Sequence, residues 1–204
     1  MRLTKKTILH VIGLVFAFGL SGCQLFQTSE DRGQILDTIS PSELESLPTE
    51  LVSIQGQRIR QWAVEAEASS NYADPEWDAA QATGAPDTLR CGDYQTAWAT
   101  AGSDSIEWLE VKFPLAVHVT AVNIVQSFNP DQVLKVELIG PLDRSFEVYS
   151  QQPNQVDQPC PYTLPISIEK TEGRFDTVRI TVDQSVLGLG WNQIDAVELV
   201  GEPE

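Results

Sequence analysis

Few side chains in this sequence could perform acid–base or nucleophilic chemistry. Its 204 residues include two histidines, His10 and His118, and neither a Gly-x-Ser-x-Gly nor a His-Glu-x-x-His motif is present. A lone histidine on a strand is more often a structural residue than a general base. The 29 acidic residues allow so many carboxylate pairs that no particular pair indicates glycoside hydrolysis. We therefore expect no catalytic activity.

The N-terminal 22 residues have the pattern of an export signal. Arg2, Lys5 and Lys6 precede an almost wholly apolar run at residues 8–20. This run is shorter than the about 20 residues that span a membrane. We expect residues 1–22 to be a signal peptide that is absent from the mature protein.

The end of this run, Leu20-Ser21-Gly22-Cys23, resembles the lipobox of bacterial lipoproteins. The resemblance implies a diacylglyceryl group on the sulfur of Cys23, cleavage before it, and acylation of the new amino terminus. Two or more acyl chains give stable anchoring, because each buried methylene contributes about 0.8 kcal/mol. We expect an extracytoplasmic protein anchored to the cell membrane or, given the resemblance of Gln24 to the outer-membrane pattern, to an outer membrane. An ordinary secretory signal is the alternative.

Removal of the signal would leave a strongly acidic chain. Loss of its three basic residues changes the formal net charge from −16 to −19. Polyanions need cations opposite them, so we expect no nucleic-acid partner. With Cys23 acylated, Cys91 and Cys160 remain, and one disulfide between them is the simplest arrangement in an oxidising compartment. A reactive thiol or a metal-binding pair is the alternative.

Residues 23–56 lack the strand pattern that follows and are predicted to be a tether. Ser40 and Glu43 form a capping box around Pro41, which predicts a short helix at about 41–47. Its leucines are expected to pack on the following domain, because two isolated turns are marginal in water.

From about residue 57 to residue 201, short alternating segments are separated by Gly, Pro, Asn and Asp, and residues 202–204 form a tail. This pattern predicts an all-β domain, an antiparallel β-sandwich of about eight strands. The expected strands are 62–68, 106–113, 118–127, 134–139, 146–149, 164–169, 177–183 and 196–200. In two of them the apolar residues alternate, so that Leu109, Val111 and Phe113, and likewise Val178, Ile180 and Val182, face one side.

Several motifs in this domain resemble the discoidin-like domains, also called coagulation factor V/VIII type C or galactose-binding-like domains. They are Trp77–Asp87, Thr96–Ala99, Trp108–Val111, Val122–Ile124, Phe128–Pro130 and Leu187–Val197. The resemblance covers about residues 57–201 and implies an eight-stranded jelly-roll sandwich.

The resemblance also implies a structural Ca²⁺ between the turn after the first strand and the last strand. Matched by position, its ligands would include Asp87, Thr96 and Glu198, and hard oxygen ligands suit Ca²⁺. The insertion of residues 89–94 departs from the family's short loop at this point.

Ligands of the resembling family bind at loops on one end of the sandwich. The corresponding aromatic and polar residues are Tyr72, Trp77, Tyr94, Phe128, Asn129, Trp191 and Asn192, with Asn71 and Asp93 beside two of them. Aromatic faces stack on sugar rings while polar side chains bind the hydroxyls. We expect a non-catalytic binding module for glycan or another cell-envelope component. The alternative is a structural or assembly lipoprotein that binds a protein partner and no small ligand.

Overall fold

The computed structural model describes residues 51–55, 57–157 and 160–203. The chain divides into two compact units, Met1–Leu36 and Asp37–Glu204, and every described residue belongs to the second. The predicted signal peptide, Cys23 and the helix predicted at 41–47 lie outside the described residues. Among the described residues, no helix is long and apolar enough to cross a membrane.

The described residues form an all-β domain in which every strand pairing is antiparallel, as predicted. The elements are β1 (Val52–Gln55), β2 (Arg58–Trp62), β3 (Glu65–Ala68), the 3₁₀ helix η1 (Ala79–Ala82), β4 (Ile106–Phe128), β5 (Val133–Gly140), the 3₁₀ turn η2 (Pro141–Asp143), β6 (Arg144–Ser150), β7 (Tyr162–Ser167), β8 (Arg174–Asp183) and β9 (Gln193–Glu202).

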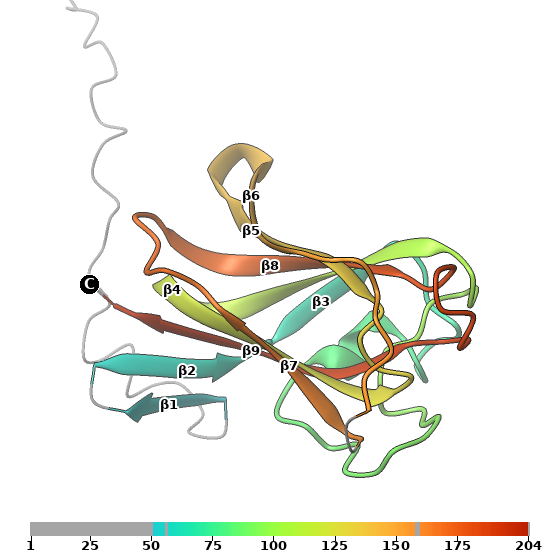
Figure 1. The fold of residues 1–204 in the computed structure, drawn as a ribbon. Coiled ribbons are helices and arrows are strands. Elements are labelled where there is room, and N and C mark those ends of the chain that lie inside the picture. The colour runs from blue at the N-terminus through green and yellow to red at the C-terminus, as the bar shows by residue number, and fades with distance from the viewer. Residues whose placement is uncertain (1–50, 56, 158–159, 204) are drawn as a thin grey trace, which may run out of the picture. The chain divides into compact units, whose positions relative to one another are not determined.

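The long strand β4 joins the two layers of the sandwich (Figure 1). Its first part pairs with β3 and β8, and β8 continues through β5 to β6. Its second part pairs with β7 and β9, and β9 continues through β2 to β1. The pairing with β8 shifts between Lys112 and Val117, around Pro114, which has no amide N–H for the ladder. β4 therefore passes from one layer to the other at this point.

The core lies between the two layers and is built from alternating apolar side chains. Leu109 and Val111 on β4 and Val178 and Ile180 on β8 are fully buried, as the alternation predicted. The opposite layer contributes Val122, Ile124, Leu164, Ile166, Val197 and Leu199 to the same cluster.

Several strand boundaries differ from the predictions. The strands expected at 106–113 and 118–127 are one continuous strand. The strand expected at 62–68 is interrupted, because the amide of Ala63 donates to Val197 in one layer and that of Val64 donates to Lys112 in the other. β1 lies inside the predicted tether and β9 extends into the predicted tail. β1 was missed because it has only four residues and Ile54 is exposed.

Candidate functional site

Loops gather at the end of the sandwich where β3, β4 and β8 end and β9 begins. The first and last residues of β4 pair near Asp183 and Gln193, so both of its ends lie at this end of the domain. The loops enclose a hollow of about 40 Å³, which we call the loop-end hollow. It is lined by Tyr72, Trp77, Asp93, Ala99, Trp191 and Gln193.

Three aromatic rings form the walls of the loop-end hollow. The centroid of the Tyr72 ring lies 5.4 Å from that of Trp77 and 5.5 Å from that of Trp191, with interplanar angles of 71° and 85°. Tyr72 is 53% exposed, whereas both tryptophans are half-buried. The structure thus brings together three residues that the sequence analysis selected, two from the loop after β3 and one from the loop before β9.

Backbone and side-chain hydrogen bonds hold these rings in place. The amide of Tyr72 donates to Ala99 O at 2.8 Å, and the amide of Ala99 donates to Trp77 O at 3.1 Å. The indole Nε1 of Trp191 donates to Thr100 O at 3.0 Å. These loops have no regular secondary structure, so such bonds fix the positions of the rings.

Asp93 supplies the carboxylate of the loop-end hollow. Its Oδ1 accepts hydrogen bonds from Trp77 Nε1 at 2.9 Å and from Gln193 Nε2 at 2.6 Å. Gln193 also accepts the amide of Tyr94 through Oε1 at 3.1 Å. Asp93 and Gln193 are therefore site residues by geometry. Of the neighbouring candidates Asp93 and Tyr94 named in the sequence analysis, Asp93 lines the loop-end hollow, whereas Tyr94 lines a different hollow. Gln193 was not among the candidates.

The two selected asparagines support the loops and do not line the loop-end hollow. Asn192 is 1% exposed, and its Nδ2 donates to Gln126 Oε1 at 2.9 Å and to Asn129 O at 3.1 Å. Asn129 Nδ2 donates to Leu189 O at 2.7 Å. Phe128 is half-buried at the end of β4. A sequence gives no signal that separates such a bracing amide from one that faces a ligand.

The disulfide lies beside this site. Cys91 and Cys160 are joined, with their Cα atoms 4.8 Å apart, as the sequence analysis expected for the simplest arrangement. The amide of Gly92 donates to Ser127 O at 3.0 Å. The loop that carries Asp93 is thus fastened both to the chain before β7 and to the end of β4.

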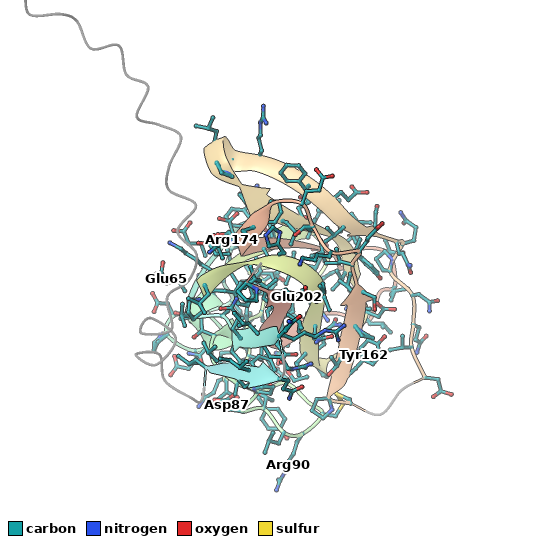
Figure 2. All side chains as sticks on the ribbon, turned by 90° about the vertical axis from the view of Figure 1, so that its left-hand side faces the viewer. Glu65, Asp87, Arg90, Tyr162, Arg174 and Glu202 are labelled. Carbon is teal, nitrogen blue, oxygen red and sulfur yellow. A yellow bond between two sulfur atoms is a disulfide. The ribbon has the colours of Figure 1, made fainter. Side chains whose placement is uncertain are left out.

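A second hollow, of about 210 Å³, is lined by Asp87, Thr88, Leu89, Arg90, Tyr94 and Thr96. The hydroxyls of Thr88 and Thr96 lie 2.6 Å apart. Figure 2 shows Arg90 projecting from the domain near this loop. The hollow therefore presents one carboxylate and two hydroxyls from a single loop.

Asp195, which the sequence analysis did not select, lies next to the second hollow. Its Oδ1 accepts the amide of Thr88 at 3.1 Å, and it is 1% exposed. Its buried Oδ2 has no hydrogen-bond partner among the described residues. Burial, and then the charge of Asp87, raise the pKa of the Asp195 carboxyl. The order of residues on a final strand does not reveal which acid turns toward a loop.

Glu198 serves another purpose than the predicted one. Its two oxygens accept hydrogen bonds from Arg60 Nε at 2.8 Å and Nη2 at 2.6 Å, and Asn123 Nδ2 donates to Oε2 at 2.8 Å. Its carboxylate is thus occupied by an ion pair, and Asp195, not Glu198, meets the loop of Asp87. Within the described part of the chain, no cluster of three or more His, Cys, Asp or Glu residues could hold a metal ion.

His118 is remote from these loops. It lies on β4 just after the passage between layers, and its Nδ1 donates to Thr171 O at 2.8 Å. This environment is that of a structural histidine.

The two-layered antiparallel sandwich is the fold that the resemblance to discoidin-like domains implied. The chain belongs to the family described as pappalysin-1, SD scarf domain, C-terminal, whose profile matches residues 52–204.

Solved structures have a similar fold. A labelled mutant of chitosan-binding module 1 from a chitosanase/glucanase of Paenibacillus sp. IK-5 has a TM-score of 0.51 and 16% identity, covering 67% of this chain and 93% of that chain. The family 32 CBM of C. perfringens NanJ, in complex with galactose, has a TM-score of 0.49 and 17% identity, covering 74% of this chain and 98% of that chain. No curated protein matches the chain by sequence.

The position of Glu198 leads to a stability prediction. Its side chain is 7% exposed, so Glu198→Ala leaves Arg60 and Asn123 without their acceptor and should cost about 3 kcal/mol of unfolding free energy in a urea titration. The matched control is Glu110→Ala, which breaks the more exposed pair with Arg179 and should cost no more than about 1 kcal/mol. Equal losses in the two variants would contradict this assignment.

Proposed function

We propose that this domain is a non-catalytic glycan-binding module and that its ligand contacts the loop-end hollow. The proposal rests on one observation, that three aromatic rings and one carboxylate line the same hollow. Ring faces favour the apolar face of a sugar, and a carboxylate accepts hydrogen bonds from its hydroxyls. The Paenibacillus module of similar fold is a chitosan-binding module, which supports a saccharide as the ligand class.

The exposed ring of Tyr72 gives the sharpest test of this proposal. In a glycan array followed by calorimetry on the purified whole chain, Tyr72→Ala should weaken binding about tenfold, because an aromatic contact of about 1.4 kcal/mol is lost. Tyr94→Ala is the matched control, since its ring is also exposed but lines the second hollow. Absence of binding to any glycan, together with a co-purifying envelope protein, would favour the assembly-lipoprotein alternative.

We also propose that the second hollow holds a structural Ca²⁺. Asp87, Asp195 and the hydroxyls of Thr88 and Thr96 are hard oxygen ligands on one loop and the final strand. The unpartnered, buried Oδ2 of Asp195 supports the fit, because a bound cation would compensate its charge. Such an ion would fasten the loop between Asp87 and Thr96 to β9.

Asp195→Asn tests the calcium proposal. The pKa of Asp195 is raised in the folded state, so its contribution favours folding at low pH and is lost as the pH rises through that pKa. Without calcium at pH 7, the neutral variant should unfold several degrees higher than the wild type in a thermal melt, and the gap should close toward acidic pH. Added CaCl₂ should stabilise the wild type and Glu198→Gln, but not Asp195→Asn. A wild type that does not respond to calcium would refute the site.

Finally, we propose that a lipid on Cys23 anchors the protein at an extracytoplasmic membrane surface. The resemblance of Leu20–Cys23 to a lipobox supports this proposal, and two or more acyl chains would make the attachment stable. The rest of the mature chain, with a formal net charge of −19 after loss of the basic signal, would not be attracted to anionic headgroups.

Cys23→Ser should move the protein from the detergent-phase membrane fraction to the soluble fraction and abolish incorporation of labelled palmitate. Ser29→Ala, a small change beyond the lipobox, should leave both measurements unchanged. Membrane retention and labelling that persist in Cys23→Ser would show that the anchor is elsewhere.

A further inference from the structure

Three buried amide side chains lie beneath the loops at this end of the domain. Gln126 is near the end of β4, Gln132 directly precedes β5, and Asn192 directly precedes β9. Gln126 and Gln132 are fully buried, and Asn192 is 1% exposed. One polar atom of each amide has no hydrogen-bond partner among the described residues, namely Gln126 Nε2, Gln132 Oε1 and Asn192 Oδ1. Such atoms are rare in folded proteins, because nothing compensates their loss of hydration.

The bonds that these amides do make fix which end of each is nitrogen and which is oxygen. Gln126 Oε1 accepts from a backbone amide and from Asn192 Nδ2, both at 2.9 Å. Gln132 Nε2 donates to two carbonyl oxygens, at 3.2 and 3.0 Å. Turning any of the three amides over would set donor against donor or acceptor against acceptor. The unpaired atoms are therefore one donor group and two acceptors.

The three amides belong to one cluster of contacts. Asn192 Nδ2 and Gln132 Nε2 donate to the same oxygen, Asn129 O, at 3.1 and 3.2 Å. Asn192 Nδ2 also bonds directly to Gln126. Nevertheless, no described acceptor lies within hydrogen-bond distance of Gln126 Nε2. Polar atoms that are near one another but not in contact are commonly joined by a water molecule.

We infer that these three amides bind a single buried water molecule. Water has two hydrogens and can accept, so it donates to Gln132 Oε1 and Asn192 Oδ1 while it accepts from Gln126 Nε2. Three hydrogen bonds are the usual number for a buried water. A cation does not suit the same three atoms, because the N–H bonds of Gln126 would point their positive ends toward it. This inference does not depend on glycan binding.

The water joins three segments that are far apart in the sequence. It connects the end of β4, at Gln126, with the chain before β5 and with the chain before β9. The last of these segments carries Trp191, which lines the loop-end hollow. The water is therefore part of the support on which that wall of the hollow rests.

Two measurements on the whole wild-type chain test the inference. A high-resolution crystal structure should show a density peak within hydrogen-bond distance of all three atoms. In solution, a rotating-frame NMR experiment separates dipolar contact from hydrogen exchange by sign, and it should show contact between water and the side-chain amide protons of Gln126. Gln61 is the internal control, because its buried amide bonds to Leu115 at both ends, at 2.7 and 3.0 Å, and should show no such contact.

The matched variants are Gln126→Met and Gln61→Met, since each replaces a fully buried amide with an apolar side chain of the same length. Gln126→Met removes the donor and should abolish the density peak, whereas Gln61→Met should retain it. A thermal melt shows whether each variant is folded. If one of them is not, the contrast between Gln126 and Gln61 in the wild type decides the question.

Three outcomes would overturn the inference. Direct bonding of Gln126 Nε2 to Gln132 or Asn192 in the crystal structure would leave no place for the water. An anomalous signal at the peak in crystals grown with RbCl would identify a monovalent cation instead. Lack of contact between water and the Gln126 amide in solution would exclude a water that stays bound. None of these outcomes bears on glycan binding, which the Tyr72→Ala measurement tests separately.

Discussion

The continuity of β4 through both layers is the constraint on which the rest of the structure depends. Because one strand of 23 residues pairs with β8 before its bend and with β9 after it, its first and last residues return to the same end of the domain. The second half packs tightly on β9, where a Cβ on Gly201 would lie 2.5 Å from His118 O. The loops before β4, after β4 and before β9 are consequently neighbours in space. The loop-end hollow is a result of this arrangement.

Loops without regular structure need another source of order, and here it is a set of buried amides. Gln126 and Asn192 bond to each other, and Gln184 accepts the amide of Asn192 at 2.7 Å while donating to Thr100 Oγ1 at 2.6 Å. Each such bond contributes only about 1 kcal/mol net, but loss of one partner leaves a buried polar group at a greater cost. The network therefore favours one arrangement of the loops that carry Trp191 and Tyr72.

The sequence predicted those features that follow from a periodic pattern of residues or from a single possible pair of partners. Alternating apolar residues predicted most of the strands and the core side chains Leu109 and Val111, and two cysteines in one exported domain predicted their pairing. The passage of β4 between layers was not predicted, because alternation says nothing of which sheet a strand joins. The bracing asparagines and the ion pair of Glu198 were also missed, since they depend on contacts between residues 60 to 140 positions apart.

Three carboxylates of this domain show why residue type alone could not assign the sites. Glu198 has both oxygens paired, and its bonds to Arg60 leave nothing for a ligand. Asp195 has one oxygen held by Thr88 and the other buried without a described partner, which is costly unless a proton or a cation compensates it. Asp93 is an exposed residue among aromatic rings. Its Oδ1 accepts hydrogen bonds from two donors, and neither of these bonds uses its Oδ2.

The hydrogen bonds already made thus separate the three roles. A fully paired carboxylate stabilises the sheet, a buried and half-paired one is suited to a cation, and an exposed and half-paired one is suited to a mobile ligand. For the same reason, the large negative net charge of the protein does not indicate which carboxylate belongs to the binding site. What matters at the loop-end hollow is a single open oxygen on Asp93, held in a fixed direction by Trp77 and Gln193.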